Sequence, residues 1–569
     1  MIHFFSLCYI ALLAGAGLLA GVMLADANNG RSRSVNSIGV PLPPDAAPPP
    51  KQVVHLFAED LPYMEWFRTI YKGAAGKYLI GEPLTRVNRN FELRGSAAER
   101  WTVSPDGLTW TFIIRRGLQW SDGQPLTAKD YEFSLKRGAD PNNGYDFEWY
   151  YHPIKNWADV ISRKKPLDAL GVKALDDYTL AVTTESPTPY LPLLLTYSWV
   201  SPRHAVQKYG DTWSTRPATC ISSGPFLLKE WTKGKQMVLV ANPMYRGRDK
   251  PFLERVVLRL FNSTTPPQTI PAYEAGEIDF TEIGNQAQLA RLLSDPILSQ
   301  QVHAFPNFWT HYLFFNTKRP PFSDRRVRQA FSHAIDRDAL CRSALKGFAI
   351  PAYAMLPPGF PAYQEDQVRD IQRYDPPLAR RLLTEAGYSN GRGFPQVEMW
   401  LRNESIMIRD AAEGIQALLK RNLGVDVEVR NLEAKTFMDG LNSHRTLFGL
   451  VPYEFDYVDP SNMLGVWMSG GRHDWANRTF DRLLVEANGE VRDPARRTAL
   501  YQQAERLLID DVGGVFITHK LVNQVWKPYI KGDALEPDRF GYRAWRGDQV
   551  ANTMITLYIT KAVDTVAQR

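Results

Sequence analysis

The sequence predicts an α/β fold in a chain large enough for more than one folded unit. Segments with the two-residue period of strands alternate with segments of helical period along most of the chain. Of the 569 residues, 44% are hydrophobic and 22% are charged, which is typical of globular proteins and unlike disordered or fibrous ones. At about 100 to 200 residues per domain, the length indicates roughly three domains or two large lobes.

The chain begins with an apolar segment, Leu7–Ala25, that carries no charged side chain. The small-x-small triplet Ala25-Asp26-Ala27 ends it, as at a signal-peptidase site. We therefore expect residues 1–27 to be a signal peptide and the mature chain to be exported. The residues before the segment include no Lys or Arg, and the segment is nearly long enough to span a bilayer, so an uncleaved membrane anchor is the alternative.

A proline-rich stretch, Pro41–Pro50 (PLPPDAAPPP), precedes the first patterned segments. Such a stretch favours the extended polyproline II conformation and reaches roughly 30 Å at ~3.1 Å per residue. We expect residues 28–50 to be a linker between the N-terminal segment and the folded body. A proline-rich ligand for another protein is the alternative.

Turn and capping signals mark the first elements of the body. The tetrapeptide Ser104-Pro105-Asp106-Gly107 separates Trp101–Val103 from Leu108–Ile114, which predicts a β-hairpin. Further on, Thr127 followed by Asp130 predicts a capped helix start.

The C-terminal half is predicted to contain four long helices. Three of them begin at Ser323 and at the Asp-Pro pairs of Asp375 and Asp493, because these residues favour helix N-termini. Apolar residues from Ile406 to Leu419 predict the fourth, which leads into a strand at Val425–Val429.

The composition argues against nucleic-acid binding. Lys and Arg number 67 against 61 Asp and Glu, and this net charge of +6 is spread over the chain without a long basic block. Aromatic residues reach 12%, a content that suits thick cores and also surfaces that bind ligands by stacking and apolar contact.

Known catalytic and metal-binding motifs are missing from the sequence. It has no G-x-S-x-G, H-E-x-x-H, P-loop or EF-hand pattern, and its ten His are scattered. We expect no cofactor, no metal site and no enzymatic activity. Because catalytic groups can be distant in sequence, an enzyme remains an alternative.

Three cysteines occur, of which Cys8 lies in the apolar segment. In an oxidising compartment Cys220 and Cys341 would be able to form a disulfide, whereas two isolated buried thiols are the alternative.

Six runs, in a fixed order, resemble the family-5 extracellular solute-binding proteins, the peptide, dipeptide and nickel receptors of ABC importers. The longest is residues 98–137, AERWTVSPDGLTWTFIIRRGLQWSDGQPLTAKDYEFSLKR. The others are SSGPFLLKEW (222–231), YEAGEIDF (273–280), FFNTKRPPFSDRRVRQAFSHAIDR (314–337), RLLTEAGY (381–388) and FDYVDPSNML (455–464). The resemblance covers essentially everything after the proline-rich stretch.

This resemblance implies a two-lobed periplasmic-binding-protein-like clamp, with mixed sheets flanked by helices, that closes on a ligand by a hinge motion. Lobe I would be built from three separate segments. The expected division is 51–81 (lobe I, first part), 82–215 (subdomain II), 216–311 (lobe I, second part), 312–522 (lobe III) and 523–569 (return to lobe I).

The resemblance also implies a monomeric periplasmic protein that binds peptides or peptide-like solutes and delivers them to an ABC permease in the inner membrane. Nickel chelates, opines and oligosaccharides are alternative ligands, because one fold hosts several functions. A hydrolytic enzyme and a membrane-anchored sensor are the alternatives from other classes.

The family pattern implies particular binding residues. Asp456, in the run DYVDP, would bind the ligand's ammonium group, although a solvated turn acid is the ordinary interpretation of such a residue. Tyr453 stands where related receptors have a pocket Trp, and Glu454 and Phe455 would provide the strand that pairs with the ligand backbone. Arg402 would bind a ligand carboxylate, with an exposed surface Arg as the alternative.

Two positions depart from the oligopeptide receptors. Ala434 stands where those receptors have a Trp, and Leu450 replaces a basic residue. We expect both changes to enlarge the cavity, to make it more apolar and to remove one carboxylate partner, which favours a longer, modified or more hydrophobic ligand.

Overall fold

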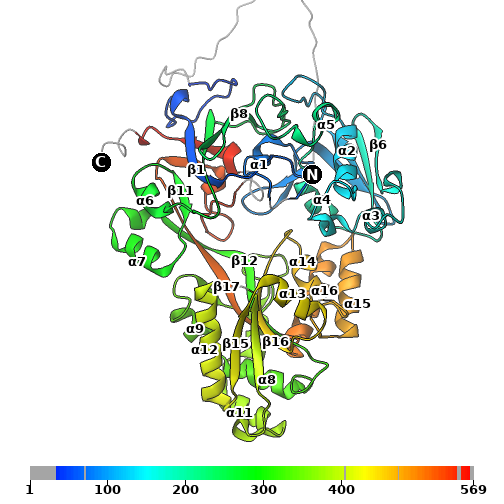
Figure 1. The fold of residues 1–569 in the computed structure, drawn as a ribbon. Helices are drawn as coiled ribbons and strands as arrows, with labels where there is room; N and C mark the ends of the chain where they lie inside the picture. Colours follow the sequence, from blue (N-terminus) through cyan, green and yellow to red (C-terminus); the bar gives the residue numbers. More distant parts are fainter. Residues whose placement is uncertain (1–33, 70–71, 403–404, 472, 548–552, 564–569) are drawn as a thin grey trace, which may run out of the picture.

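The computed structural model describes residues 34–69, 72–402, 405–471, 473–547 and 553–563. Two lobes lie one above the other, and the long strands β12 (Val302–Phe315) and β17 (Gly514–Trp526) run between them (Figure 1). Both lobes contain β-sheets flanked by helices. The predicted α/β class and the two-lobed form are therefore confirmed.

The upper lobe contains two four-stranded sheets. The first has the order β1-β10-β9-β8. Its strand β1 precedes the strands of the second sheet in the chain, and its other three strands follow them. Its strands are β1 (Val53–Glu59), β8 (Phe226–Thr232), β9 (Gln236–Ala241) and β10 (Arg255–Phe261). The second has the order β4-β5-β7-β6. Its strands are β4 (Ala98–Val103), β5 (Thr109–Ile114), β6 (Val172–Asp176) and β7 (Thr179–Thr183).

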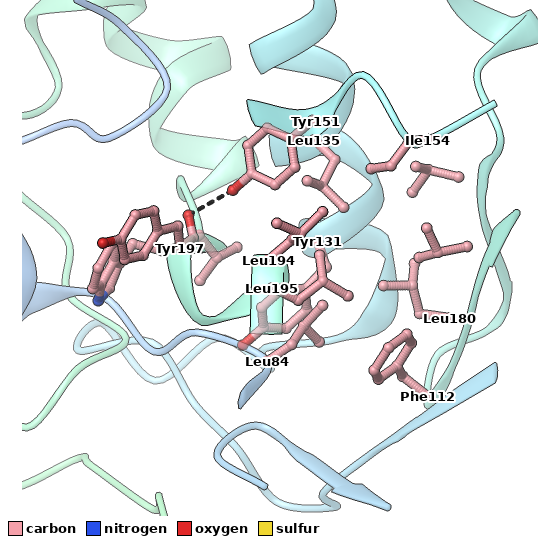
Figure 2. Packing of buried hydrophobic residues seen from close by; sticks show 14 of the residues in the cluster. Leu84, Phe112, Tyr131, Leu135, Tyr151, Ile154, Leu180, Leu194, Leu195 and Tyr197 are labelled. Carbon is pink, nitrogen blue, oxygen red and sulfur yellow. Dashed lines mark hydrogen bonds between the residues drawn. The ribbon is translucent and has the colours of Figure 1, made fainter. Parts of the chain in front are cut away.

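The second sheet contains the predicted hairpin, as β4 and β5, and the predicted capped helix packs against it. This helix is α2 (Ala128–Ala139), and Thr127 and Asp130 form a capping box at its start. Figure 2 shows the core beneath it, in which the Tyr151 hydroxyl donates a hydrogen bond of 2.8 Å to the Tyr197 carbonyl. Tyr197 lies at the edge of this core and also lines the space between the lobes.

The lower lobe is built on a seven-stranded sheet of order β11-β17-β12-β16-β14-β15, with β13 also paired to β17. The remaining strands are β11 (Phe280–Glu282), β13 (Ala349–Pro351), β14 (Val397–Arg402), β15 (Val427–Leu432) and β16 (Phe448–Glu454). At its far end β17 pairs with β11, through Trp526 and Phe280. The expected boundaries at 311/312 and 522/523 fall inside β12 and β17, so continuous strands carry the chain between the lobes.

Helices cover this sheet. The helices of the lower lobe are α8 (Arg325–Ala334), α9 (Arg337–Arg342), α10 (Glu365–Val368), α11 (Pro376–Glu385), α12 (Ile406–Leu423), α13 (Ala434–Asn442), α14 (Pro460–Gly465), α15 (Arg478–Gly489) and α16 (Pro494–Asp510). The four predicted helices correspond to α8, α11, α12 and α16. Asp375 and Asp493 cap α11 and α16 as predicted. The cap of α8 is Asp324 and not Ser323, because the Asp324 carboxylate accepts the Arg326 N–H.

The upper lobe also contains short helices and two small two-stranded sheets. The helices are α1 (Lys77–Ile80), α3 (Trp157–Ile161), α4 (Leu191–Leu194), α5 (Arg203–Tyr209), α6 (Thr269–Glu274), α7 (Gln286–Ser294) and α17 (Thr553–Thr556). One small sheet pairs β2 (Thr85–Val87) with β3 (Leu93–Gly95), and the other pairs β18 (Ile530–Gly532) with β19 (Leu557–Ile559).

The proline-rich stretch packs against the upper lobe, so the prediction of an extended linker was wrong for its described part. Leu42 and Ala47 are buried, and the Ala47 N–H donates a hydrogen bond of 2.7 Å to the Ile559 carbonyl. Apolar residues between the prolines supply the contacts that hold the segment.

Residues 1–33, with the predicted signal peptide, lie outside the described residues. Within the described ones, no helix is long and apolar enough to cross a membrane.

Cys220 and Cys341 are both free and buried. They belong to different hydrophobic clusters, the first in the upper lobe and the second in the lower one. Burial raises the pKa of both thiols to about 12. The alternative of two isolated buried thiols therefore holds, and no disulfide joins them.

Candidate ligand-binding site

A cleft of about 600 Å³ lies between the two lobes. The upper lobe contributes mainly apolar and aromatic side chains, and the strands β12 and β17 contribute one side. The acidic groups come from the end of β16, from the residue two positions beyond it and from β11. The lining includes Phe91, Phe147, Tyr197, Glu282, Phe305, Asn307, Glu454, Phe455, Asp456, Gln524, Trp545 and Arg546. A largely apolar cleft with a few polar groups is typical of a small-molecule site.

Asp456 lies two residues beyond β16, and neighbouring side chains fix its carboxylate. Its Oδ2 accepts hydrogen bonds from the Tyr453 hydroxyl and from Asn462 Nδ2, both at 3.0 Å. The Asp456 N–H in turn donates to Asn462 Oδ1 at 2.9 Å. Asn462, on α14, was missed by the sequence analysis, and the only signal for it was its place within the run FDYVDPSNML.

The second acid of that run has a structural role. Asp459 accepts two hydrogen bonds from Arg497, at 2.7 and 2.8 Å, and caps α14 through the Ser461 N–H at 3.0 Å. A bidentate Arg–carboxylate pair fixes geometry as well as adding energy. The turn that presents Asp456 is thus anchored to α16.

A side cavity of about 500 Å³ adjoins the cleft. Arg402, at the end of β14, lines it together with Tyr453 and the partly exposed indole of Trp149. Glu454 and Asp456 line both cavities, so they form the wall between them. The structure therefore brings together all five residues named from the sequence, with Phe455 facing the cleft and Arg402 the side cavity.

The last residues of β16 have a sheet partner on one side. Tyr453 and Glu454 pair with Thr310 and Trp309 of β12, whereas the described pairing with β14 is limited to Gly449 opposite Trp400. The opposite edge, from Pro452 onward, borders the side cavity. Such an edge is suited to adding an extended peptide by main-chain hydrogen bonds.

The pKa of Glu454, at the end of β16, is raised above its ordinary value. Burial is the main cause of the raised pKa, and the neighbouring carboxylates of Asp456 and Glu282 add to it. The Lys520 ammonium opposes this shift. The side chain of Glu454 is nevertheless open to the cleft. A cationic ligand group would relieve this repulsion.

Aromatic contacts connect the lobes beside the cleft. Tyr190 of the upper lobe stacks on Tyr457 of the lower one, with ring centroids 5.2 Å apart. Phe91 contacts Phe455 edge to face at 6.4 Å. Part of the high aromatic content predicted to serve either cores or ligand surfaces therefore lies at this interface.

The two departures from the oligopeptide receptors do not shape these cavities as predicted. The Leu450 side chain is buried in the lower-lobe core, because it lies on the face of β16 that packs there. Ala434 is exposed at the first turn of α13. Neither residue lines the cleft or the side cavity. Within the described residues, no group of three or more His, Cys, Asp or Glu is arranged to hold a metal ion.

Two lobes joined by paired strands, with a lined cleft between them, define a two-lobed binding protein of the periplasmic type. The family model for bacterial extracellular solute-binding proteins, family 5, matches residues 92–475. The chain belongs to this family.

Relatives and solved structures support the assignment. The chain is 34% identical to the periplasmic oligopeptide-binding protein OppA of Salmonella typhimurium over 486 residues, which is 83% of this chain and 86% of that protein. It is 30% identical to the murein peptide-binding protein MppA of Escherichia coli, over 84% of this chain and 87% of the relative.

The structural similarity extends over nearly the whole chain. The unliganded open form of the murein tripeptide-binding protein MppA has a TM-score of 0.78 at 27% identity, covering 92% of this chain and 100% of the other. Haemophilus influenzae OppA in complex with the peptide RPPGFSPFR has a TM-score of 0.66 at 26% identity, covering 90% and 99%.

Proposed function

We propose that this chain is the periplasmic substrate-binding protein of an ABC transporter and that it captures peptides or peptide-like solutes between its lobes. The relatives OppA and MppA are named for oligopeptide and murein peptide binding, which supports a ligand of this class. One observation carries the proposal most directly: Asp456 is a fixed carboxylate at the wall between two cavities.

In this proposal Asp456 binds the ligand's ammonium group. The ligand backbone extends along the end of β16, where Tyr453, Glu454 and Phe455 contact it. Arg402 remains predicted to bind a ligand carboxylate. The ligand would reach it by entering the side cavity past Trp149. Main-chain pairing would let the protein accept many side chains.

Capture requires the lobes to close. The TM-score of 0.78 with the unliganded open form of MppA, against 0.68 with another structure of MppA, supports an open arrangement here. The pairing of β12 with β17 has register shifts between Pro306 and Thr310 and between His311 and Tyr312, next to the cleft. We infer that bending at these irregular positions closes the clamp.

Other parts of the proposal follow the family. Residues 1–27 would be the signal peptide that directs the chain to the periplasm, and the segments 51–81, 82–215, 216–311, 312–522 and 523–569 would form the lobes. The loaded monomer would deliver its ligand to a permease in the inner membrane. The relatives named above are binding proteins, and neither a cofactor nor a catalytic step is part of this function.

Mass spectrometry of the protein, isolated without denaturation, tests this function. The expected result is a set of co-purified peptides in the wild type that is depleted in Asp456→Asn. A co-purified nickel chelate, opine or oligosaccharide would replace the peptide class, turnover of the ligand would indicate an enzyme, and retention of an intact N-terminus in the membrane fraction would indicate an anchored sensor. The proposal would be refuted if no peptide co-purified and if added peptide pools left the melting temperature unchanged.

A further inference from the structure

Arg546 is the one basic residue among the described residues that line the cleft. It follows Trp545 in the C-terminal return to the upper lobe, opposite the acidic segment of the lower lobe. The Trp545 backbone exchanges two hydrogen bonds with the Gln524 side chain of β17, at 2.9 and 3.0 Å. This exchange fixes the position of Arg546 relative to the hinge strand.

The guanidinium group of Arg546 is held rigidly. Its carbon lies 4.7 Å from the ring centroid of Phe91 and 4.8 Å from that of Phe305. One nitrogen donates a hydrogen bond of 2.8 Å to Asp538, and the Arg546 side chain is only 7% exposed. A guanidinium has five N–H donors in a planar fork, so the bond to Asp538 leaves capacity for a second carboxylate.

Stability alone gives little reason for a buried charge at this place. Burial lowers the pKa of Arg546, and the Asp538 carboxylate opposes that shift. Replacing a buried ion pair by apolar residues of similar volume is often neutral or stabilising. A preorganised cation in the wall of a ligand cleft, by contrast, is suited to recognition of an anionic group.

We propose that Arg546 binds a carboxylate of the ligand while Asp456 binds its ammonium group. This inference rests on the proposed peptide function. Phe91 connects the two ends of the site, because its ring contacts both Arg546 and Phe455, the neighbour of Asp456. The two charges lie on different lobes, so a zwitterionic ligand bridges them and favours the closed state.

Calorimetry with matched peptides tests the inference. The probes are tri-, tetra- and penta-alanine as free acids, the same peptides as C-terminal amides, and Ala-Glu-Ala amide. In the wild type we expect amidation to weaken binding about 30-fold or more for the peptide length that spans the cleft. If the plain amides bind more weakly than the acids and Ala-Glu-Ala amide binds as tightly as the acids, the partner of Arg546 is a side-chain carboxylate of the ligand.

The variant is Arg546→Met combined with Asp538→Asn, which removes both members of the buried pair and leaves no unpaired charge. It should bind acids and amides equally and should bind the amides as the wild type does. Arg543→Met is the matched control, because this arginine lies in the same C-terminal return, is half-exposed beside Glu536 and lines neither cavity; it should keep the preference for the acid.

Three outcomes would overturn the inference. These are an acid-to-amide ratio that the double variant leaves unchanged, an equal loss of affinity for acids and amides in the double variant, and loss of the ratio in Arg543→Met as well. A wild type that binds none of the peptides, acid or amide, would refute the proposed function itself, and the inference with it.

Discussion

Glu505 is a buried acid whose protonation should control the stability of the lower lobe. Its side chain is fully buried on α16, and its Oε1 accepts a hydrogen bond of 2.8 Å from the Leu356 N–H. Burial raises its pKa from 4.5 to about 7, and the nearby Glu365 carboxylate contributes to the rise. Glu365 also contacts His519 of the hinge strand β17 at 3.1 Å.

The sign and size of the effect follow from linkage. Below pH 4.5 the acid is protonated in both the folded and the unfolded chain, and its contribution to stability is fully present. Between pH 4.5 and about 7 only the folded state retains the proton, so the free energy of unfolding falls as pH rises. At 1.36 kcal/mol per pKa unit the loss is about 3 kcal/mol, or roughly 8 °C in the melting temperature of a lobe of this size.

Thermal melting at pH 5, 6, 7 and 8 measures this loss. Glu505→Gln cannot ionise, so its melting temperature should decline less between pH 5 and 7 than that of the wild type. Glu385→Gln, at the exposed end of α11, is the matched control and should keep the wild-type slope. Equal slopes for the wild type and Glu505→Gln would show that Glu505 does not hold its proton in the folded state.

Three further predictions concern the site and the cores. Asn462→Ala should weaken peptide binding about tenfold in calorimetry, because Asp456 loses a hydrogen-bond donor, and unchanged affinity would contradict the positioning role. Trp149→Ala should reduce the affinity for ligands that fill the side cavity with little change in melting temperature, since this indole is 42% exposed; a large drop in melting temperature would indicate a core role instead. A reducing agent should leave the melting temperature unchanged because Cys220 and Cys341 are unpaired, and a decrease would reveal a disulfide.

Local signals in the sequence were sufficient for much of the secondary structure. The capping box at Thr127 and the Asp-Pro starts at Asp375 and Asp493 act within one helical turn, so they can be recognised without tertiary information. The proline-rich stretch was misjudged because its conformation depends on distant partners such as Ile559.

The candidate site shows the same limit. A family run pointed to Asp456, but the residues that complete its surroundings come from distant parts of the chain. Trp149 and Arg546 are separated from it by long stretches of sequence and meet it only through the fold. The prediction for Leu450 failed because residue type alone does not show which face of β16 a side chain occupies.

The central claim, that Asp456 binds the ammonium group of a peptide, is tested most directly by Nα-acetylation of the ligand. Calorimetry would compare a peptide that binds the wild type with its acetylated form, in the wild type and in Asp456→Asn. The account predicts that acetylation weakens binding to the wild type about 30-fold or more and has little effect in the variant. Equal affinity of the wild type for the free and the acetylated peptide would contradict it.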